Sequence, residues 1–261
     1  MFDTHSHLNF DAFKKDYKEI IKCSFANGIN GIINVGSQLE TSKKAIKIAQ
    51  EFPNKNIYAT IGLHPIHAND EKFDLKEYQE MIKNSSVKAV GEIGLDYYRI
   101  SDMEVQKIQE KIFLEQLNLA KKFHLPVILH CRGAIENPLK AYEKMINILM
   151  KYPDSTGVIH CFGANWKIAE QFLRLNFYIS FTGIITFSEN KTIDETIEKI
   201  PLDKILTETD CPYLTPAPFR GKRNKPLFVK YVIKKIAEIK NLNFEKVDKI
   251  TTQNAIKLFN I

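Results

Sequence analysis

Two histidines near the start of the chain, His5 and His7, have the spacing that points most directly to chemistry. They lie in the short segment Phe2-Asp3-Thr4-His5-Ser6-His7, which is typical of a first β-strand. Side chains on a strand alternate between its two faces, so residues two apart share one face. Two imidazoles directed to one point are the beginning of a metal site.

Further histidines and acids recur at the ends of later strand-like segments. Every histidine of the seven except His124, which lies in a helix-to-strand connection, is found at such an end. Each of these residues alone is more often structural than a ligand. Together, four imidazoles and two carboxylates form the mixed nitrogen and oxygen shell that divalent cations accept, and one shared Glu can bridge two ions. The predicted set is His5, His7, Glu92, His130, His160 and Asp210.

A basic segment, residues 216–226, follows the last of these acids. Lys222 and Arg223 lie there on a loop that contains glycine and proline. Such a loop either grips phosphates, with Arg in bidentate fashion, or is simply a solvated basic face. Its predicted place beside the metal ligands favours substrate binding. Arg99 and Arg132, also near strand ends, are secondary candidates.

Three of the four cysteines directly follow a predicted ligand. Cys131, Cys161 and Cys211 suggest a soft-metal site at first sight. Neighbouring residues on a strand face opposite sides, however, so these thiols are predicted to be small buried hydrophobic groups. The chain contains no Cys-x-x-Cys, so neither a disulfide framework nor a thiolate zinc site is expected.

Short β-rich runs alternate with longer helical patterns along the whole chain. Residues 103–123 show a helical period that places Val105, Ile108, Ile112, Leu119 and Phe123 on one face. Two more amphipathic helices follow Leu227. The predicted strands are residues 2–7, 31–35, 57–63, 88–94, 126–130, 157–161, 177–181 and 204–207.

This alternation predicts an α/β fold with a parallel sheet and helical crossovers. Eight such units in roughly 250 residues match a (β/α)8 TIM barrel, a single domain over residues 1–261 with extra C-terminal helices. No Gly-x-Gly-x-x-Gly follows the first strand, which argues against a dinucleotide-binding fold. Active sites of such barrels lie at the carboxyl ends of the strands, where the predicted ligands are found.

The composition is that of a globular protein, with 44% hydrophobic residues and a net charge of +6. No apolar run approaches the ~20 residues of a membrane helix, and we expect no signal peptide because the predicted first strand begins at once. We therefore expect a cytoplasmic protein that makes no use of a membrane. The mild positive charge permits a polyanionic partner without requiring one.

Several ordered motifs resemble those of the TatD family of metal-dependent deoxyribonucleases, over nearly the whole chain. They are Asp3-Thr4-His5-Ser6-His7-Leu8, Gly91-Glu92-Ile93-Gly94-Leu95-Asp96-Tyr97, His160-Cys161-Phe162, Glu208-Thr209-Asp210-Cys211-Pro212-Tyr213-Leu214 and Arg220-Gly221-Lys222-Arg223-Asn224. The resemblance implies an amidohydrolase-type TIM barrel. It implies two divalent cations on the six predicted ligands, shared by Glu92, with Mg²⁺ or Mn²⁺ in catalysis and Zn²⁺ possible in the isolated protein. The implied partner is DNA at single-stranded ends, cleaved often from the 3′ end.

Three positions depart from the family pattern. Lys225 follows Asn224 where the family has an acid, which makes the basic loop more positive. Ile66 separates Pro65 from His67, so His64 alone carries over as a phosphate or metal neighbour. Gly163-Ala164 replaces the Ser-Gly that often follows the His-Cys-Phe motif.

The predicted mechanism is metal-assisted hydrolysis, with Asp210 and Glu92 as the catalytic carboxylates. Asp210 is expected to hold and deprotonate a water whose pKa the cations lower to about 7. His64, Lys222 and Arg223 are expected to offset charge on the phosphate, and Glu208 to orient a ligand from behind. The alternative is a hydrolase of a small ester, lactone or amide in the same superfamily; a nucleic-acid-binding or scaffold protein without turnover is a further one. Glu92 occupies the place of the carbamylated Lys of dihydroorotase-like enzymes, which disfavours that branch.

Overall fold

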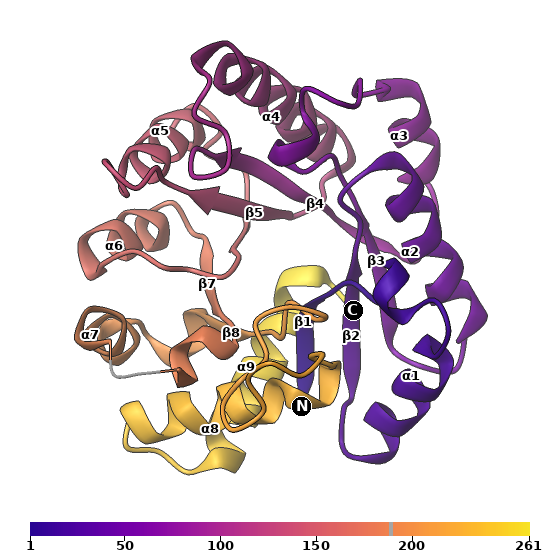
Figure 1. Ribbon diagram of the computed structural model, residues 1–261, viewed down its shortest axis with the longest axis vertical. Coiled ribbons are helices and arrows are strands. Elements are labelled where there is room, and N and C mark those ends of the chain that lie inside the picture. Colours follow the sequence, from indigo (N-terminus) through magenta and orange to yellow (C-terminus); the bar gives the residue numbers. More distant parts are fainter. Residues whose placement is uncertain (188–189) are drawn as a thin grey trace.

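The computed structural model describes residues 1–187 and 190–261. Within these residues eight parallel strands pair in chain order and form a barrel, which confirms the predicted TIM-barrel fold (Figure 1). The strands are β1 (Phe2–Ser6), β2 (Gly31–Val35), β3 (Ile57–Ile61), β4 (Val87–Asp96), β5 (Val127–Arg132), β6 (Gly157–Ile159), β7 (Tyr178–Phe181) and β8 (Ile205–Thr207). β4 and β5 end two residues later than the sequence predicts, whereas β3 and β6 end two residues earlier.

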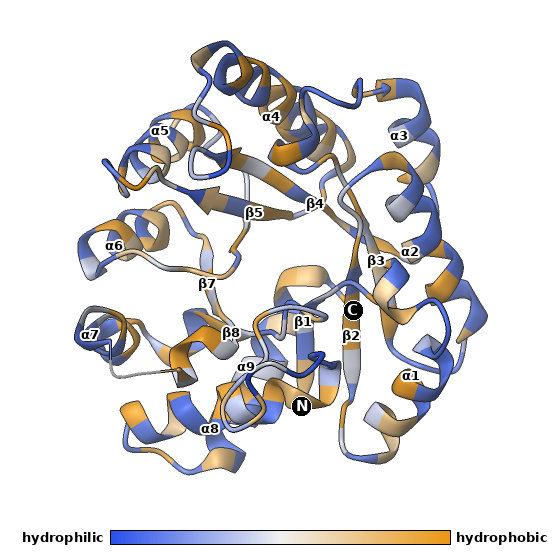
Figure 2. Ribbon diagram, viewed as in Figure 1, coloured by the Kyte–Doolittle hydropathy of each residue, from blue (hydrophilic) through white to orange (hydrophobic). Residues whose placement is uncertain are grey.

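Helices alternate with the strands and surround them, and each carries both hydrophilic and hydrophobic residues (Figure 2). In the described part of the chain, no helix is both long enough and apolar enough to cross a membrane. The α-helices are α1 (Tyr17–Ala26), α2 (Leu39–Glu51), α3 (Leu75–Met81), α4 (Met103–Phe123), α5 (Lys140–Leu149), α6 (Trp166–Arg174), α7 (Lys191–Lys199), α8 (Val229–Ile239) and α9 (Phe244–Phe259). Short 3-10 helices are η1 (Asp11–Phe13), η2 (Pro65–His67), η3 (Gly183–Thr186), η4 (Leu202–Lys204) and η5 (Pro226–Phe228).

Helix α4 has the predicted bounds and buries Ile112 and Leu119 of the predicted face, but not all of that face. Ile108, predicted on the buried face, is 38% exposed. The reason is that two glutamines, Gln109 and Gln116, take buried positions instead. Gln116 accepts a hydrogen bond from the Leu63 N–H at 2.7 Å and donates one to the Leu63 carbonyl at 3.0 Å. The buried face of α4 therefore bonds to the backbone just past β3, where sequence periodicity counts only apolar residues.

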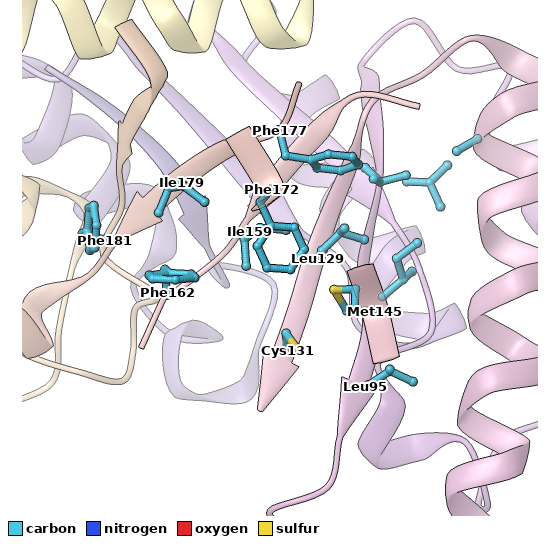
Figure 3. Packing of buried hydrophobic residues seen from close by; sticks show 14 of the residues in the cluster. Leu95, Leu129, Cys131, Met145, Ile159, Phe162, Phe172, Phe177, Ile179 and Phe181 are labelled. Atoms are coloured by element: carbon cyan, nitrogen blue, oxygen red, sulfur yellow. The ribbon is translucent and has the colours of Figure 1, made fainter. Parts of the chain in front are cut away.

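The hydrophobic core lies in two places. A large cluster fills the space between strands and helices, where residues of β4–β7 pack against α5 and α6 (Figure 3). A second cluster combines strand residues such as Phe2, Ile33 and Val158 with Ala255, Leu258 and Phe259 of α9. Because these strand residues precede the site-bearing strand ends, α9 covers the amino end of the barrel and leaves the carboxyl end for polar side chains.

The barrel closes between β8 and β1 through the segment that follows β8. The Asp210 N–H donates to the His5 carbonyl at 2.8 Å, and the His7 N–H donates to the Cys211 carbonyl at 2.8 Å. The buried Asp3 carboxylate accepts hydrogen bonds from the Thr209 N–H at 2.9 Å and the Thr209 hydroxyl at 2.7 Å. The predicted ligands His5, His7 and Asp210 and three residues next to or near them thus form the closing seam.

Candidate metal centre

The structure brings the six predicted ligands together at the carboxyl end of the barrel. His5 and His7 project from β1 and its end to the same side, and their Nε2 atoms are 3.1 Å apart. Nδ1 of His7 donates to the Val35 carbonyl at 2.9 Å, which leaves the Nε2 lone pair directed into the centre. Asp210 adds a carboxylate oxygen 3.3 Å from His7 Nε2 and 3.7 Å from His5 Nε2.

Glu92 on β4 lies between two groups of imidazoles. Its Oε2 is 3.4 Å from His5 Nε2 and 3.8 Å from His7 Nε2. Its Oε1 is 2.9 Å from His130 Nδ1 and 3.5 Å from His160 Nε2. Burial opposes the charge of Glu92, but the surrounding imidazoles outweigh it and hold its pKa well below the ordinary value. Glu92 is therefore an ionised carboxylate that presents one oxygen to each group.

Glu208 orients His160, as the sequence predicts for a residue behind the ligands. Its Oε1 accepts hydrogen bonds from His160 Nδ1 at 2.7 Å and from the Cys161 N–H at 2.8 Å. This contact directs the opposite ring nitrogen, Nε2, toward Glu92. Burial favours the neutral imidazole, but Glu208 and Glu92 outweigh it and raise the pKa of His160 to about 10.

His64 also lies in the centre, but its ring presents a donor. The Ile66 N–H donates to His64 Nδ1 at 3.1 Å, which places the proton of the neutral ring on Nε2. That Nε2 is 3.3 Å from Glu92 Oε1. Burial lowers the pKa of His64 to about 4, so the ring is neutral. His64 is thus a hydrogen-bond donor at the edge of the centre. His67, which follows Ile66, is half-buried and lies outside these contacts.

Asp96, at the last position of β4, is a site residue that the sequence analysis did not assign. Its Oδ2 accepts a hydrogen bond from His130 Nε2 at 3.0 Å, while His130 Nδ1 faces Glu92. Burial lowers the pKa of His130, but the two carboxylates outweigh it and raise the pKa. The available signal was an acid four residues after Glu92, an even spacing that keeps both on one strand face.

The basic loop joins the centre through Asn224 and not through Arg223. The buried Asn224 side chain donates to the Thr209 carbonyl at 2.9 Å, one residue before Asp210. Arg223 is ion-paired with Asp16, and its guanidinium also donates to the Ala12 carbonyl. Lys222 is exposed, with its ammonium 5.7 Å from the Phe219 ring centre. Neither cation contacts the ligand cluster.

Two of the three cysteines beside the ligands are buried in the core, as predicted. Cys131 and Cys211 belong to the hydrophobic cluster outside the strands, and Cys131 is drawn among its neighbours in Figure 3. Cys161 is only partly buried, and its Sγ lies 3.3 Å from the Thr182 hydroxyl. Burial raises the pKa of all three thiols well above the ordinary value, so none is poised as a thiolate.

The donor set fits divalent cations. Three groups of side chains each offer ligand atoms within 4.8 Å of one another: His5–His7–Asp210, His5–His160–Glu208 and His64–Glu92–His130. The first brings a free nitrogen lone pair and a carboxylate oxygen together in a buried space, beside Oε2 of the ionised Glu92. Acceptors packed this closely repel one another unless a cation lies between them. The six predicted ligands all belong to these three groups, which also include His64 and Glu208, so these are the residues that would hold such ions.

Comparisons with known proteins agree with this centre. The model of the TatD related DNase family matches residues 2–260. The metal-dependent hydrolase YabD of Bacillus subtilis is 40% identical over 264 residues, covering 100% of this chain and 99% of YabD. The solved structure of YjjV, a TatD homologue of Escherichia coli K12, superposes with a TM-score of 0.90 at 28% identity, over 100% of this chain and 98% of YjjV. The solved structure of a TatD-family hydrolase of Entamoeba histolytica superposes with a TM-score of 0.84 at 25% identity, over 99% of this chain and 97% of that protein. The chain therefore belongs to the TatD family of metal-dependent hydrolases.

Proposed function

We propose that this protein hydrolyses DNA phosphodiester bonds with two divalent cations, Mg²⁺ or Mn²⁺. The observation that carries the proposal is the position of Glu92, whose two oxygens face two separate groups of imidazoles. A carboxylate placed in this way is suited to bridge a pair of cations, as two-metal phosphodiester hydrolases require. The name of the matching family, TatD related DNase, supports DNA as the substrate.

The cations, when bound, supply a Lewis acid for the phosphoryl oxygen and lower the pKa of a water ligand. Asp210 is the residue proposed to take the proton of that water. Burial opposes its charge, but the neighbouring imidazoles of His7, His160 and His5 outweigh it and keep the pKa of Asp210 below the ordinary value. Its side chain is 15% exposed, compared with 5% for Glu92, so Asp210 is the carboxylate of the pair that solvent reaches.

His64 is proposed to bind the substrate through its Nε2–H. The backbone bond from Ile66 fixes this tautomer, and burial keeps the ring neutral. A fixed neutral donor suits a non-bridging phosphate oxygen, on which negative charge develops during hydrolysis. Lys222 is proposed to contribute a charge from the loop beside Asp210, whereas Arg223 fastens that loop to Ala12 of η1 and to Asp16 at the start of α1.

The test is cleavage of a 5′-labelled single-stranded DNA oligonucleotide by metal-stripped protein after addition of Mg²⁺, Mn²⁺ or Zn²⁺. We expect a metal-dependent ladder that shortens from the 3′ end. Asp210→Asn should abolish the ladder, and its metal content is measured in parallel to separate loss of the base from loss of the ions. An absence of cleavage with every metal would refute the DNase proposal and favour the small-ester hydrolase.

A further inference from the structure

Strands β4 and β5 extend together beyond the layer of the metal ligands. Their pairing continues to Asp96 and Arg132, and the Tyr97 N–H donates to the Arg132 carbonyl at 2.7 Å. His130 and Arg132 are two residues apart on β5, so both face the barrel mouth. Cys131 between them faces the outer core (Figure 3). Arg132 therefore starts about 7 Å farther along the strand from His130, on the same face.

Tyr98 holds the Arg132 side chain in place. The guanidinium carbon is 3.7 Å from the centre of the Tyr98 ring, a close cation–π contact. The ring is 47% exposed and lies two residues after Asp96, the partner of His130. Arg132 thus follows His130 by two residues on β5, and Tyr98 follows Asp96 by two residues, just past the end of β4.

Arg132 differs from Arg223 in what its charge contacts. Arg223 is committed to Asp16, whereas none of the ion pairs within residues 1–187 and 190–261 involves Arg132. Arg132 is also an exposed residue. A guanidinium that is held against an aromatic ring but has its N–H groups available is a pre-organised bidentate site for an anion with two oxygens, such as phosphate.

We propose that Arg132, oriented by Tyr98, binds a backbone phosphate of the substrate strand beside the metal centre. The inference rests on the proposed function, since a phosphodiester chain is the substrate that offers a second phosphate to this position. It assigns to Arg132, a secondary candidate in the sequence analysis, the phosphate contact that was predicted there for Arg223. Arg132 binds and positions the substrate strand here, and it lies two residues beyond the ligand His130 on β5.

The experiment measures binding of fluorescein-labelled single-stranded DNA to the metal-stripped protein by fluorescence anisotropy, at several salt concentrations. Arg132→Ala should weaken binding about 10- to 100-fold, the range for loss of a charged hydrogen bond. It should also reduce the slope of log affinity against log salt by about 0.7, as for one lost contact to a single strand. Arg132→Lys should keep the salt slope and recover only part of the affinity.

Two further variants test the role of the ring. Tyr98→Leu should weaken binding less than Arg132→Ala and leave the salt slope unchanged, because the charge remains but is no longer held against the ring. Tyr98→Phe should bind as the wild type does. The matched control is Arg174→Ala, because Arg174 is an exposed arginine at the end of α6 on the amino side of the barrel. This substitution should change neither the DNA affinity nor its salt slope.

The outcomes separate this inference from the proposed function. If Arg132→Ala binds DNA as Arg174→Ala does, or if the wild type binds none, the inference is wrong. Cleavage by the wild type with an unaffected Arg132→Ala leaves the DNase proposal standing and removes Arg132 from it. Weakened binding in a protein that cleaves no DNA supports the phosphate contact and refutes the hydrolytic proposal.

Discussion

Replacing Glu208 by Gln tests whether the negative charge that contacts Nδ1 of His160 raises the metal affinity of the centre. Oε1 of Glu208 already accepts both local hydrogen bonds, from His160 Nδ1 and the Cys161 N–H. An amide oxygen at the same position can accept the same two bonds. The substitution therefore removes the negative charge while it retains the geometry of His160.

The expected effect on metal affinity follows from what Glu208 contacts. Carboxylates that hold a ligating imidazole are worth about 10- to 100-fold in metal affinity or activity. Glu208→Gln should therefore weaken binding of Mn²⁺ or Zn²⁺ by about tenfold, since the hydrogen bond remains. Glu208→Ala should weaken it by about 100-fold, because His160 also loses its orientation.

The same change has a separate cost in stability. In the metal-stripped protein the substitution removes the charge that faces His160, whose pKa Glu208 raises, while the buried Oε2, which has no hydrogen-bond partner among the described residues, is replaced by an NH₂ group in the same surroundings. A hydrogen bond to a charged group contributes about 1.5–3 kcal/mol and a neutral one about 1 kcal/mol, so Glu208→Gln should lower the unfolding free energy by about 1–2 kcal/mol. Urea unfolding of the metal-stripped protein measures this cost independently of the ions, and a lower midpoint with an unchanged slope indicates it.

The assay is a metal titration against a competing chelator, with Glu195→Gln as the matched control. Glu195 is an acid on α7 whose contact with Lys199 is solvent-exposed, so its replacement should leave metal affinity unchanged. Metal binding by folded Glu208→Gln that equals the wild type would refute the reasoning, because the charge would then contribute nothing through His160.

Two further predictions concern the scaffold of the centre. Gln116→Leu leaves the buried N–H and carbonyl of Leu63 without partners, so it should lower the unfolding free energy by about 2–5 kcal/mol in urea unfolding. The control Gln106→Leu loses one partly buried hydrogen bond and should lower the unfolding free energy by less than about 1 kcal/mol in the same experiment. Arg223 holds the pKa of Asp16 below its ordinary value, so their ion pair stabilises the fold above pH ~4, and this contribution is lost as the pH falls through the lower pKa of the folded state. Asp16→Asn should therefore cost at most about 1 kcal/mol at pH 7, as expected for a half-exposed pair, and nothing near pH 2; an equal cost at both pH values in urea unfolding would contradict this assignment.

The sequence predicted the barrel and the polar residues at its strand ends because both depend on local patterns. Alternation on strands places His5 with His7, and the βα order fixes which strand ends share a face. The predicted ends of the strands were less accurate: β4 and β5 each extend two residues farther, and their last residues are the polar Asp96 and Arg132. Polar residues at strand termini give no periodic signal of their own.

Contacts between distant segments account for the remaining differences. Nothing in the local sequence couples Arg223 to Asp16, which lies 207 residues earlier, so the basic loop was interpreted from charge alone. The buried face of α4 was wrong at Ile108 because Gln109 and Gln116 bond to backbone that follows other strands. A polar residue on a helix is ordinarily assigned to solvent, and only the fold shows which backbone groups need it.

The seam between β8 and β1 links the stability of the barrel to the geometry of the centre. The two backbone bonds that close it involve His5, His7 and Asp210, which are themselves predicted ligands. A slip of one residue in this register would turn His5 and His7 away from Asp210. Asp3 opposes such a slip, because its two carboxylate oxygens accept both hydrogen bonds from Thr209 across 206 residues of chain. Asp3 is buried and is not a predicted ligand, but it fixes the strand register that brings His5 and His7 to Asp210.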